Sequence, residues 1–328
     1  MDKVSKRRDA HFDALRGAGI LLVVFGHLIE KPSSESPILQ AAYIGIYSFH
    51  MPLFVFLAGA FARETLGRRD YRKIVWTLVL PLVLFQPLYI GMGRLTGWYE
   101  YSPLTPYWLL WFIASMICWR LLLPLFASPA GLVAAFALSV AAGYDDGIGY
   151  SLSVSRTLYF LPFFVLGHLF GADLVALARR HGGVFALVFA LAMALVMVWW
   201  TQGLEPSALT GSHDYANGGA QSAHPALARM GILALSAAAV LGFSAIVPGR
   251  AMLLRWFGER SLSIYLLHGL VVMAFVAAGG PALIPQPLLL PALGLLAVLI
   301  GLGTAVADGP MRRLFSPSRQ AGERVTAG

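Results

Sequence analysis

The residues best suited to chemistry in this sequence are an arginine and a histidine inside one long apolar segment. Arg16 and His27 lie in FDALRGAGILLVVFGH, eleven residues apart. Eleven residues make about three turns of an α-helix, so both side chains would lie on one face, about 16 Å apart along the axis. Titratable residues inside a membrane span are costly and are therefore candidates for function. The alternatives are a structural hydrogen bond for His27 and an Arg16 side chain that extends to the membrane surface.

Two nearby polar residues could complete this site. His50 lies in the next apolar segment, at an expected depth similar to that of His27. Pro52 follows it, and a proline inside a helix releases a backbone carbonyl and can bend the helix. Asp13 precedes Arg16 by three residues, a spacing that allows an ion pair on a helix.

Three further candidates lie later in the chain. His268 occurs in SLSIYLLHGLVV, Arg156 begins the sixth apolar segment at its outer end, and Trp111 belongs to an aromatic cluster. A packed core histidine is the alternative interpretation for His268. For Trp111 the alternative is the ordinary belt of aromatic residues at a membrane surface.

The motifs that the sequence lacks narrow the chemistry. It contains no P-loop, GxSxG or HExxH pattern, and its single cysteine, Cys118, can form neither an intrachain disulfide nor a zinc cluster. No metal site is predicted. Aspartates and glutamates fall in loops or near the ends of apolar segments, so histidine would have to carry any acid–base chemistry in the membrane. Its ordinary pKa of about 6.5 suits a general base.

The composition determines which kind of protein positions these residues. The chain has 328 residues, of which 58% are hydrophobic and 12% charged, and its mean hydropathy is +0.71. A single soluble core cannot bury that much apolar surface, and a disordered chain would need low hydrophobicity and high charge. The composition therefore predicts a polytopic helical membrane protein.

Apolar segments of suitable length predict about ten membrane spans. The segments are continuous rather than alternating, which favours helices over a barrel. We expect an all-α integral membrane protein forming a single domain over residues 1–328. The fifth segment is the shortest. The ten segments are 12–29, 41–62, 75–93, 107–126, 130–143, 157–177, 183–201, 226–247, 261–279 and 283–307.

The distribution of charge predicts an orientation. Most of the 24 lysines and arginines lie in loops that a ten-span chain would place on one side, together with both termini. The positive-inside rule therefore predicts a basic cytoplasmic N-terminus (1–11) and a cytoplasmic tail (311–328). The net charge of +8 is explained by this topology, and no nucleic-acid partner is expected. The N-terminal apolar segment lacks a clear cleavage site and is expected to be a retained span.

Several segments together resemble one family. FDALRGAGILLVVFGH resembles the opening of the membrane-bound acyltransferase-3 family, whose signature is a basic residue, ten others and a histidine; Arg16 and His27 fit it. FHMPLFVFLAGAFARE and the following YRKI resemble the second-span motif and loop, with Ala58 where serine is common. YWLLWFIASMICWRLLLP, RTLYFLPFFVLGHLFG and FGERSLSIYLLHG resemble the branch of fucose 4-O-acetylase-like proteins. The similarity covers nearly the whole chain.

This resemblance implies an O-acyltransferase of the bacterial inner membrane. Such an enzyme would transfer an acyl group, with acetyl expected, from cytoplasmic acyl-CoA to a hydroxyl of a glycan or small hydroxylated acceptor. His27 would be the general base and Arg16 would orient the donor, with membrane lipids around the protein. A covalent acetyl-histidine relay is the mechanistic alternative. His50 would orient His27 or the substrate.

Basic residues after the second span could attract the anionic nucleotide of CoA. These residues are Arg69, Arg72 and Lys73. The positive-inside rule, which places basic residues in cytoplasmic loops, explains them equally well. A transporter or flippase of a sugar or lipid-linked glycan is the rival function. The placement of Arg16 and His27 on one face, without a carboxylate relay, favours acyl transfer over transport.

Overall fold

The computed structural model describes residues 9–99, 104–149, 151–218 and 222–315. Every regular element in these ranges is a helix or a helical turn, so the predicted all-α class is confirmed. The expectations for the basic residues of the first eight positions and for the tail after residue 315 lie outside the described residues.

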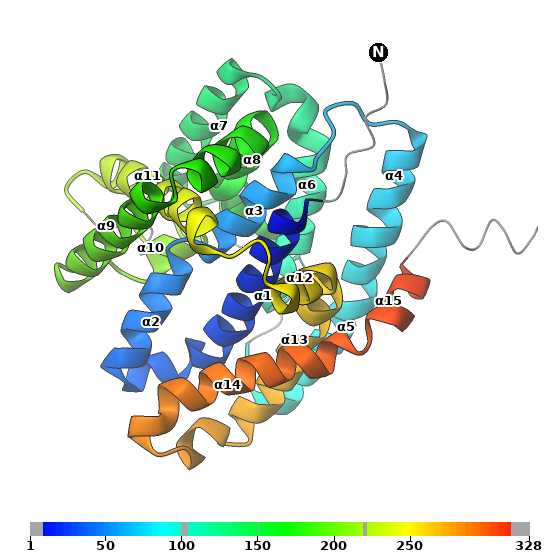
Figure 1. The fold of residues 1–328 in the computed structure, drawn as a ribbon, viewed down its shortest axis with the longest axis vertical. Helices are drawn as coiled ribbons and strands as arrows, with labels where there is room; N and C mark the ends of the chain where they lie inside the picture. The colour runs from blue at the N-terminus through cyan, green and yellow to red at the C-terminus, as the bar shows by residue number, and fades with distance from the viewer. Residues whose placement is uncertain (1–8, 100–103, 150, 219–221, 316–328) are drawn as a thin grey trace, which may run out of the picture.

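Fifteen α-helices form the described part of the chain, joined by short helical turns (Figure 1). A π-helical stretch, Val75–Val79, makes α4 and α5 nearly continuous. The helices are α1 (Ala10–Glu30), α2 (Pro37–Tyr47), α3 (His50–Ala60), α4 (Arg68–Ile74), α5 (Leu80–Thr96), α6 (Trp111–Phe126), α7 (Pro129–Ala141), α8 (Val154–Arg180), α9 (Gly182–Thr201), α10 (Ser207–Thr210), α11 (Pro225–Ile246), α12 (Met252–Glu259), α13 (Ser261–Ala277), α14 (Gln286–Ala305) and α15 (Asp308–Leu314).

All ten predicted apolar segments are helical, but they are not ten equal spans. Among the described residues, eight helical segments are long and apolar enough to cross a membrane. The predicted ninth span is α13, which meets α12 at an angle of 79° and makes a bent pair with it. The predicted fifth span is the shorter α7. The prediction therefore located the helices correctly, but length and composition support eight spans, or nine when the bent pair is counted.

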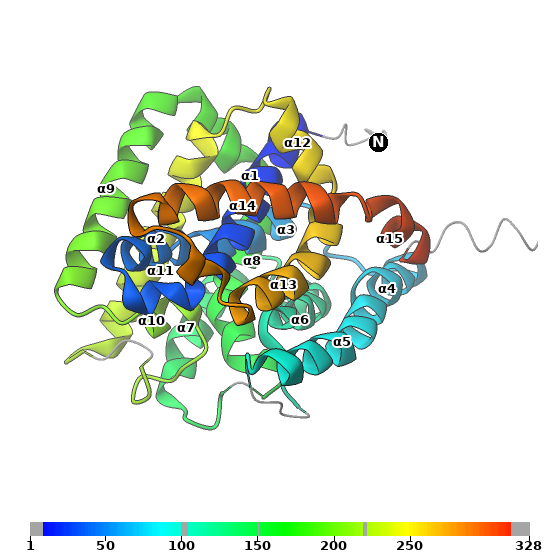
Figure 2. The same ribbon diagram turned by 90° about the horizontal axis from the view of Figure 1, so that it is seen from below.

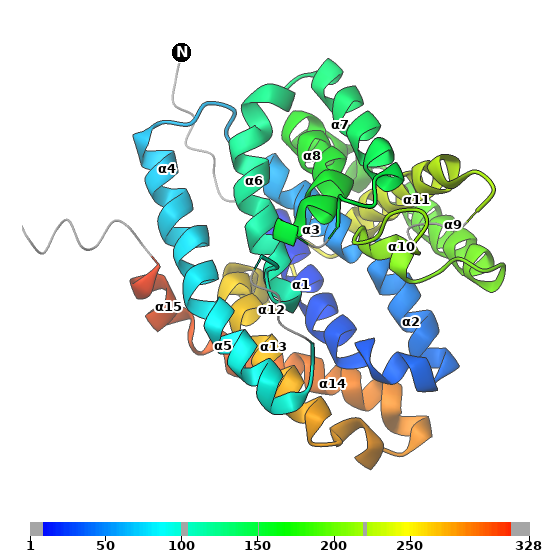
Figure 3. The same ribbon diagram turned by 180° about the vertical axis from the view of Figure 1, so that it is seen from behind.

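Helix α1 lies near the middle of the bundle (Figure 1). It contacts α2, α3, α12, α13 and α14. Figure 2 shows α14 crossing one side of the molecule, and Figure 3 shows α4 and α5 on the opposite side from α9. Side chains from several distant parts of the chain can therefore reach α1.

Glycines let two helix pairs approach until their backbones touch. A Cβ atom on Gly17 of α1 would lie 1.8 Å from the backbone oxygen of Leu254 in α12. A Cβ on Gly167 of α8 would lie 2.0 Å from the oxygen of Phe56 in α3, and one on Gly59 would lie 2.0 Å from that of Phe164. Small residues at such contacts are typical of membrane helices, because close backbone packing replaces the hydrophobic driving force that lipid removes.

The second predicted span is broken between α2 and α3. Pro52 cannot donate to Ser48, the residue four positions earlier. The Ser48 carbonyl instead accepts a hydrogen bond of 2.6 Å from the Ser236 hydroxyl of α11. The carbonyl that Pro52 was expected to release thus has a donor from another helix, and the break places His50 at the first position of α3.

We expect Gly167→Ala to destabilise the protein and Gly294→Ala to leave it as stable or slightly more so. The first substitution forces α3 and α8 apart, at about 1–3 kcal/mol or more. Gly294 in α14 has no atom within 4 Å of an added Cβ, and alanine favours a helix over glycine by about 1 kcal/mol. Thermal unfolding of both variants in the same detergent measures the difference. Equal midpoints would show that this contact tolerates a methyl group.

Candidate active site

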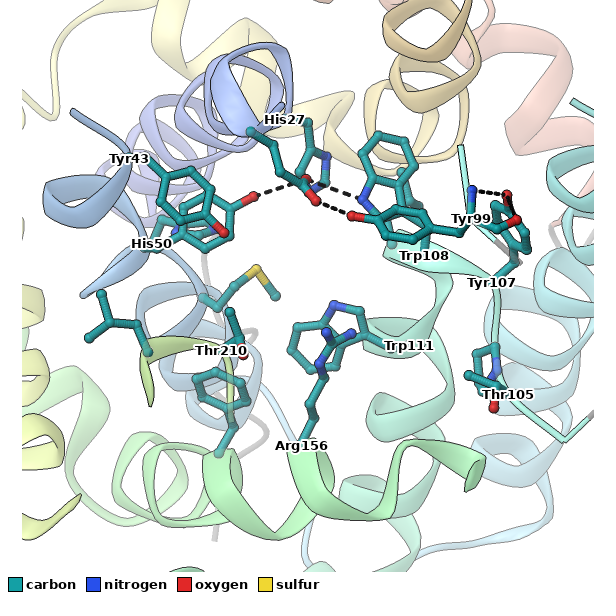
Figure 4. Close-up of a pocket in the computed structure, with 17 residues that line it drawn as sticks. His27, Tyr43, His50, Tyr99, Thr105, Tyr107, Trp108, Trp111, Arg156 and Thr210 are labelled. Carbon is teal, nitrogen blue, oxygen red and sulfur yellow. Dashed lines mark hydrogen bonds between the residues drawn. The ribbon is translucent and has the colours of Figure 1, made fainter. Parts of the chain in front are cut away.

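A cavity of about 580 Å³ lies where the end of α1 meets the starts of α3, α6 and α8 (Figure 4). We call it the polar cavity, because a carboxylate, a guanidinium and two imidazoles line it together with several aromatic rings. Its lining residues are His27, Glu30, Tyr43, Tyr47, His50, Met51, Tyr99, Thr105, Pro106, Tyr107, Trp108, Leu109, Trp111, Arg156, Phe160, Leu209 and Thr210.

His27 is joined to a second histidine far along the chain. Its Nδ1 lies 3.0 Å from Nε2 of His268 in α13, and the two rings are stacked, with centroids 5.2 Å apart. Nδ1 of His268 lies 2.8 Å from the Ile264 carbonyl, which can only accept, so this nitrogen carries the hydrogen. In neutral His268, Nε2 must then accept from Nδ1–H of His27. This assignment leaves Nε2 of His27 unprotonated, with a lone pair, on a side chain that lines the polar cavity.

His50 reaches the same cavity by a similar local bond. Its Nδ1 donates to the Ile46 carbonyl, 2.8 Å away, across the break between α2 and α3. Its ring packs edge-on against Tyr47, with centroids 4.7 Å apart. The side chain is 1% exposed, so its orientation is fixed by packing as well as by the hydrogen bond.

Glu30 lies one helical turn beyond His27 and gathers three donors around its carboxylate. Tyr47 donates to it at 3.3 Å, the Trp108 indole donates at 3.2 Å, and Tyr99 donates through its hydroxyl. Figure 4 shows Tyr99 and Trp108 side by side near His27. Because these donors come from α2 and from the segment between α5 and α6, the carboxylate connects two separate walls of the polar cavity.

Arg156 and Trp111 form another wall. The Arg156 guanidinium lies 5.0 Å from the centre of the Trp111 ring, and Trp111 stacks on Phe160 at 5.4 Å. Arg156 lies in the first turn of α8, and Trp111 lies in the first turn of α6. Among the described residues, no group of three His, Cys, Asp or Glu side chains is placed to hold a metal ion.

The segment after α9 contributes the remaining wall through Leu209 and Thr210. A buried arginine in α11 holds this segment in place, since Arg229 donates to the Ser139 carbonyl at 3.1 Å and to the His213 carbonyl at 3.0 Å. Arg229 thus ties the backbone of this segment to α7 and α11, and the segment adds two side chains to the cavity lining.

Arg16 lines a second, smaller cavity of about 180 Å³. Its guanidinium pairs with Asp13 at 3.0 Å and lies 4.5 Å from the centre of the Phe61 ring. We call this space the apolar cavity because aliphatic and aromatic side chains form most of its lining. The lining residues are Arg16, Ile20, Val23, Met51, Phe54, Leu57, Ala58, Leu78, Phe112, Ile113, Met116, Ser261, Leu262 and Tyr265.

The structure brings together most of the residues proposed from the sequence. His27, His50, Arg156 and Trp111 line the polar cavity, and His268 contacts it through His27. Asp13 and Arg16 form the expected pair at the other end of α1. Arg69, Arg72 and Lys73 lie exposed on α4 and line neither cavity.

Sequence reasoning missed Glu30 and the tyrosines around it. The sequence placed Glu30 only among the acidic residues in loops or near the ends of apolar segments. The available signal was its spacing, since a residue three positions after His27 lies on the same helical face. Tyr47 and Tyr99 had no such signal, because their contacts with Glu30 depend on how separate helices pack.

Comparison with known proteins identifies the family. The family model described as "Acyltransferase domain" matches residues 9–306. The nodulation protein NolL of Sinorhizobium fredii is 28% identical over 299 residues, covering 81% of this chain and 79% of that protein. NolL of Mesorhizobium japonicum is 27% identical over 220 residues, covering 60% of this chain and 57% of that protein. No solved structure matches the chain.

We expect Glu30→Ala to loosen the segment between α5 and α6, because it removes the acceptor shared by Tyr47, Tyr99 and Trp108. Hydrogen–deuterium exchange of peptides covering 104–110 should become faster. Glu35→Ala is the matched control, since Glu35 is exposed in the turn after α1. Unchanged exchange in Glu30→Ala would mean that the carboxylate does not hold this wall of the polar cavity.

Proposed function

Since this chain belongs to the acyltransferase family matched over residues 9–306, we propose that it is a membrane O-acyltransferase. It would transfer an acetyl group from acetyl-CoA to a hydroxyl of a carbohydrate acceptor. The observation that carries this proposal is the hydrogen-bond chain from Ile264 through His268 to His27. This chain leaves Nε2 of His27 unprotonated, as a base, on a side chain that lines a cavity of about 580 Å³.

The lining of the polar cavity supports a carbohydrate as the acceptor. Sugars present apolar C–H faces and many hydroxyl groups, so they suit aromatic walls with a few polar groups that fix orientation. Tyr43, Trp108 and Trp111 provide the walls, whereas Glu30 can accept from hydroxyls and Arg156 can donate to them. With neutral histidines, the formal charges of Glu30 and Arg156 cancel, which favours an uncharged sugar over an anionic one.

In the proposed reaction, Nε2 of His27 removes the proton of an acceptor hydroxyl as its oxygen attacks the thioester carbonyl. A C–O bond forms and the C–S bond breaks. The CoA thiolate leaves and takes up the proton that His27 holds, so the products are an ester and a neutral thiol. General-base catalysis of this kind contributes about 10²–10⁴-fold to the rate.

His268 acts as a positioning residue in this scheme. By accepting from Nδ1–H of His27, it fixes the tautomer whose Nε2 is basic and holds the ring against Trp108, 4.6 Å away between centroids. His50 and Glu30 would orient the acceptor, since both line the cavity beside His27.

The donor would approach from the Arg16 end of α1. Arg16 can pair with a phosphate of CoA, and the apolar cavity beyond it suits the arm that carries the thioester. Arg69, Arg72 and Lys73 would contribute weaker, longer-range attraction for the nucleotide from α4.

The proposal includes a location and an orientation. We place the protein in the bacterial inner membrane with both termini in the cytoplasm, where CoA is found. This orientation counts the shorter α7 and the bent pair α12–α13 as crossings, because a chain with ten crossings has most of its cationic loops on the cytoplasmic side. The polar cavity would then open toward the outer face and receive the acceptor there. A transporter remains the alternative class, but it gives no role to the basic His27 tautomer.

Transfer of radiolabelled acetyl from acetyl-CoA by the purified protein in liposomes tests the function directly. We expect label on sugar acceptors, analysed by mass spectrometry, and its loss by about 10²–10⁴-fold in His27→Ala. His168→Gln is the control, since His168 lies in α8 and lines neither cavity. Sugar that crosses the liposome membrane without being acetylated would support a transporter instead. Label trapped on His27 without acceptor would replace direct transfer with the covalent relay.

His268→Phe should lower kcat by about 10- to 100-fold, as loss of an orienting partner does, while KM for the donor changes little. The aromatic ring keeps the volume but removes the acceptor for Nδ1–H of His27. The pH dependence of kcat should also change, because neither the neutral nor the protonated form of His27 can then donate to the His268 imidazole. A variant with unaltered kcat and pH profile would show that His268 is only a packed core histidine.

Arg16→Gln should raise KM for acetyl-CoA by about tenfold, the loss of one charge-assisted hydrogen bond, and leave KM for the acceptor unchanged. Arg72→Gln, on exposed α4, serves as a comparison and should have a smaller effect. Binding of CoA to both variants, measured by calorimetry, checks this order. An Arg16 variant with wild-type CoA affinity would limit Arg16 to a structural pair with Asp13.

A further inference from the structure

Met51 is the one described residue that lines both the polar and the apolar cavity. It lies in the first turn of α3, directly after His50 and the break that follows α2. It also packs against two hydrophobic clusters, and each of them includes residues of α1. Its side chain thus lies at the boundary between the cavity that contains His27 and the cavity that contains Arg16.

Aromatic side chains form another part of this boundary, and a hydrogen bond holds one of them. Tyr265 lines the apolar cavity and donates through its hydroxyl to the carbonyl of Leu109, which lines the polar cavity. Phe112 packs against Tyr265, with ring centroids 5.8 Å apart. Methionine is unbranched and has three rotatable side-chain bonds, so Met51 can move without breaking a hydrogen bond, whereas Tyr265 cannot.

The two cavities differ in what they can hold. The polar cavity has charged and hydrogen-bonding groups that can hold water, whereas the apolar cavity has an aliphatic and aromatic lining. A thioester in contact with water and a general base would be hydrolysed, giving a carboxylate and a thiol with no acceptor modified. A closed wall between the cavities prevents this side reaction.

We propose that Met51 is a movable partition between the donor and acceptor cavities. It keeps water of the polar cavity from the thioester and moves aside when the acyl group advances to His27. This inference rests on the proposed acyl transfer, and it assigns Met51 a role in coupling the donor to the acceptor rather than in the chemistry itself. Met51 is therefore a positioning residue.

Hydrolysis in the absence of acceptor tests the partition. Met51→Ala leaves a passage that water can occupy, so release of acetate and free CoA from acetyl-CoA should rise on the order of tenfold relative to acetyl transfer. Met51→Leu keeps the volume and should remain within about twofold of wild type. An unchanged ratio of hydrolysis to transfer in Met51→Ala would overturn the proposal.

A second measurement needs no activity. In a Cys118→Ala background, Ala58→Cys places a thiol on the lining of the apolar cavity. A membrane-impermeant anionic methanethiosulfonate reagent, added on the side of the polar cavity, should label this thiol about fivefold or more faster with Met51→Ala than with Met51 or Met51→Leu. Size-exclusion chromatography confirms that each variant is folded. Equal labelling rates would contradict the partition.

The two measurements separate failure of the inference from failure of the function. Wild-type protein that transfers acetyl normally, with equal labelling in all three Met51 variants, rejects the partition alone. Wild-type protein that shows no acetyl transfer rejects the proposed enzyme, and the labelling rates still decide whether Met51 separates the two cavities.

Discussion

Each backbone carbonyl and each side-chain N–H inside a membrane must find a hydrogen-bond partner within the protein, because lipid provides none. This constraint determines how the site is built. His50 and His268 each use Nδ1 to donate to the carbonyl four residues earlier, at 2.8 Å. Both imidazoles therefore keep Nε2 for other partners. In His268 that nitrogen meets His27, so a local backbone bond in α13 sets the protonation pattern of a side chain in α1.

The same constraint explains why breaks in the helices occur where they do. The break before α3 is stable because Ser236 donates to the Ser48 carbonyl, and the residues that follow it can then turn toward the interior. A continuous helix over 37–60 would turn the His50 side chain in a different direction relative to α1. Polar contacts from α11 thus help to position residues around the polar cavity, although α11 contributes no side chain to its lining.

The helical fold and the face shared by Arg16 and His27 could be predicted from the sequence, because both follow from hydrophobic length and from the period of a single helix. The sequence could not predict that Arg16 and His27 line different cavities. This separation depends on Met51 and Tyr265, which approach α1 from helices more than twenty residues away in sequence. The tyrosines that donate to Glu30 were missed for the same reason, since Tyr47 comes from α2 and Tyr99 from the segment before α6. Tertiary packing, which the sequence pattern does not encode locally, made these groups neighbours.

The division of α1 between two environments has a chemical consequence. Its Arg16 end has an ion pair with Asp13 next to an apolar space, and its His27 end has hydrogen-bonding groups around a larger one. In the proposed reaction a thioester must be kept from water, whereas a sugar needs polar partners to be oriented. One helix can satisfy both requirements only if the two ends are separated by packed side chains. Close packing of α1 against α12 at Gly17 keeps this helix fixed while other elements complete each cavity.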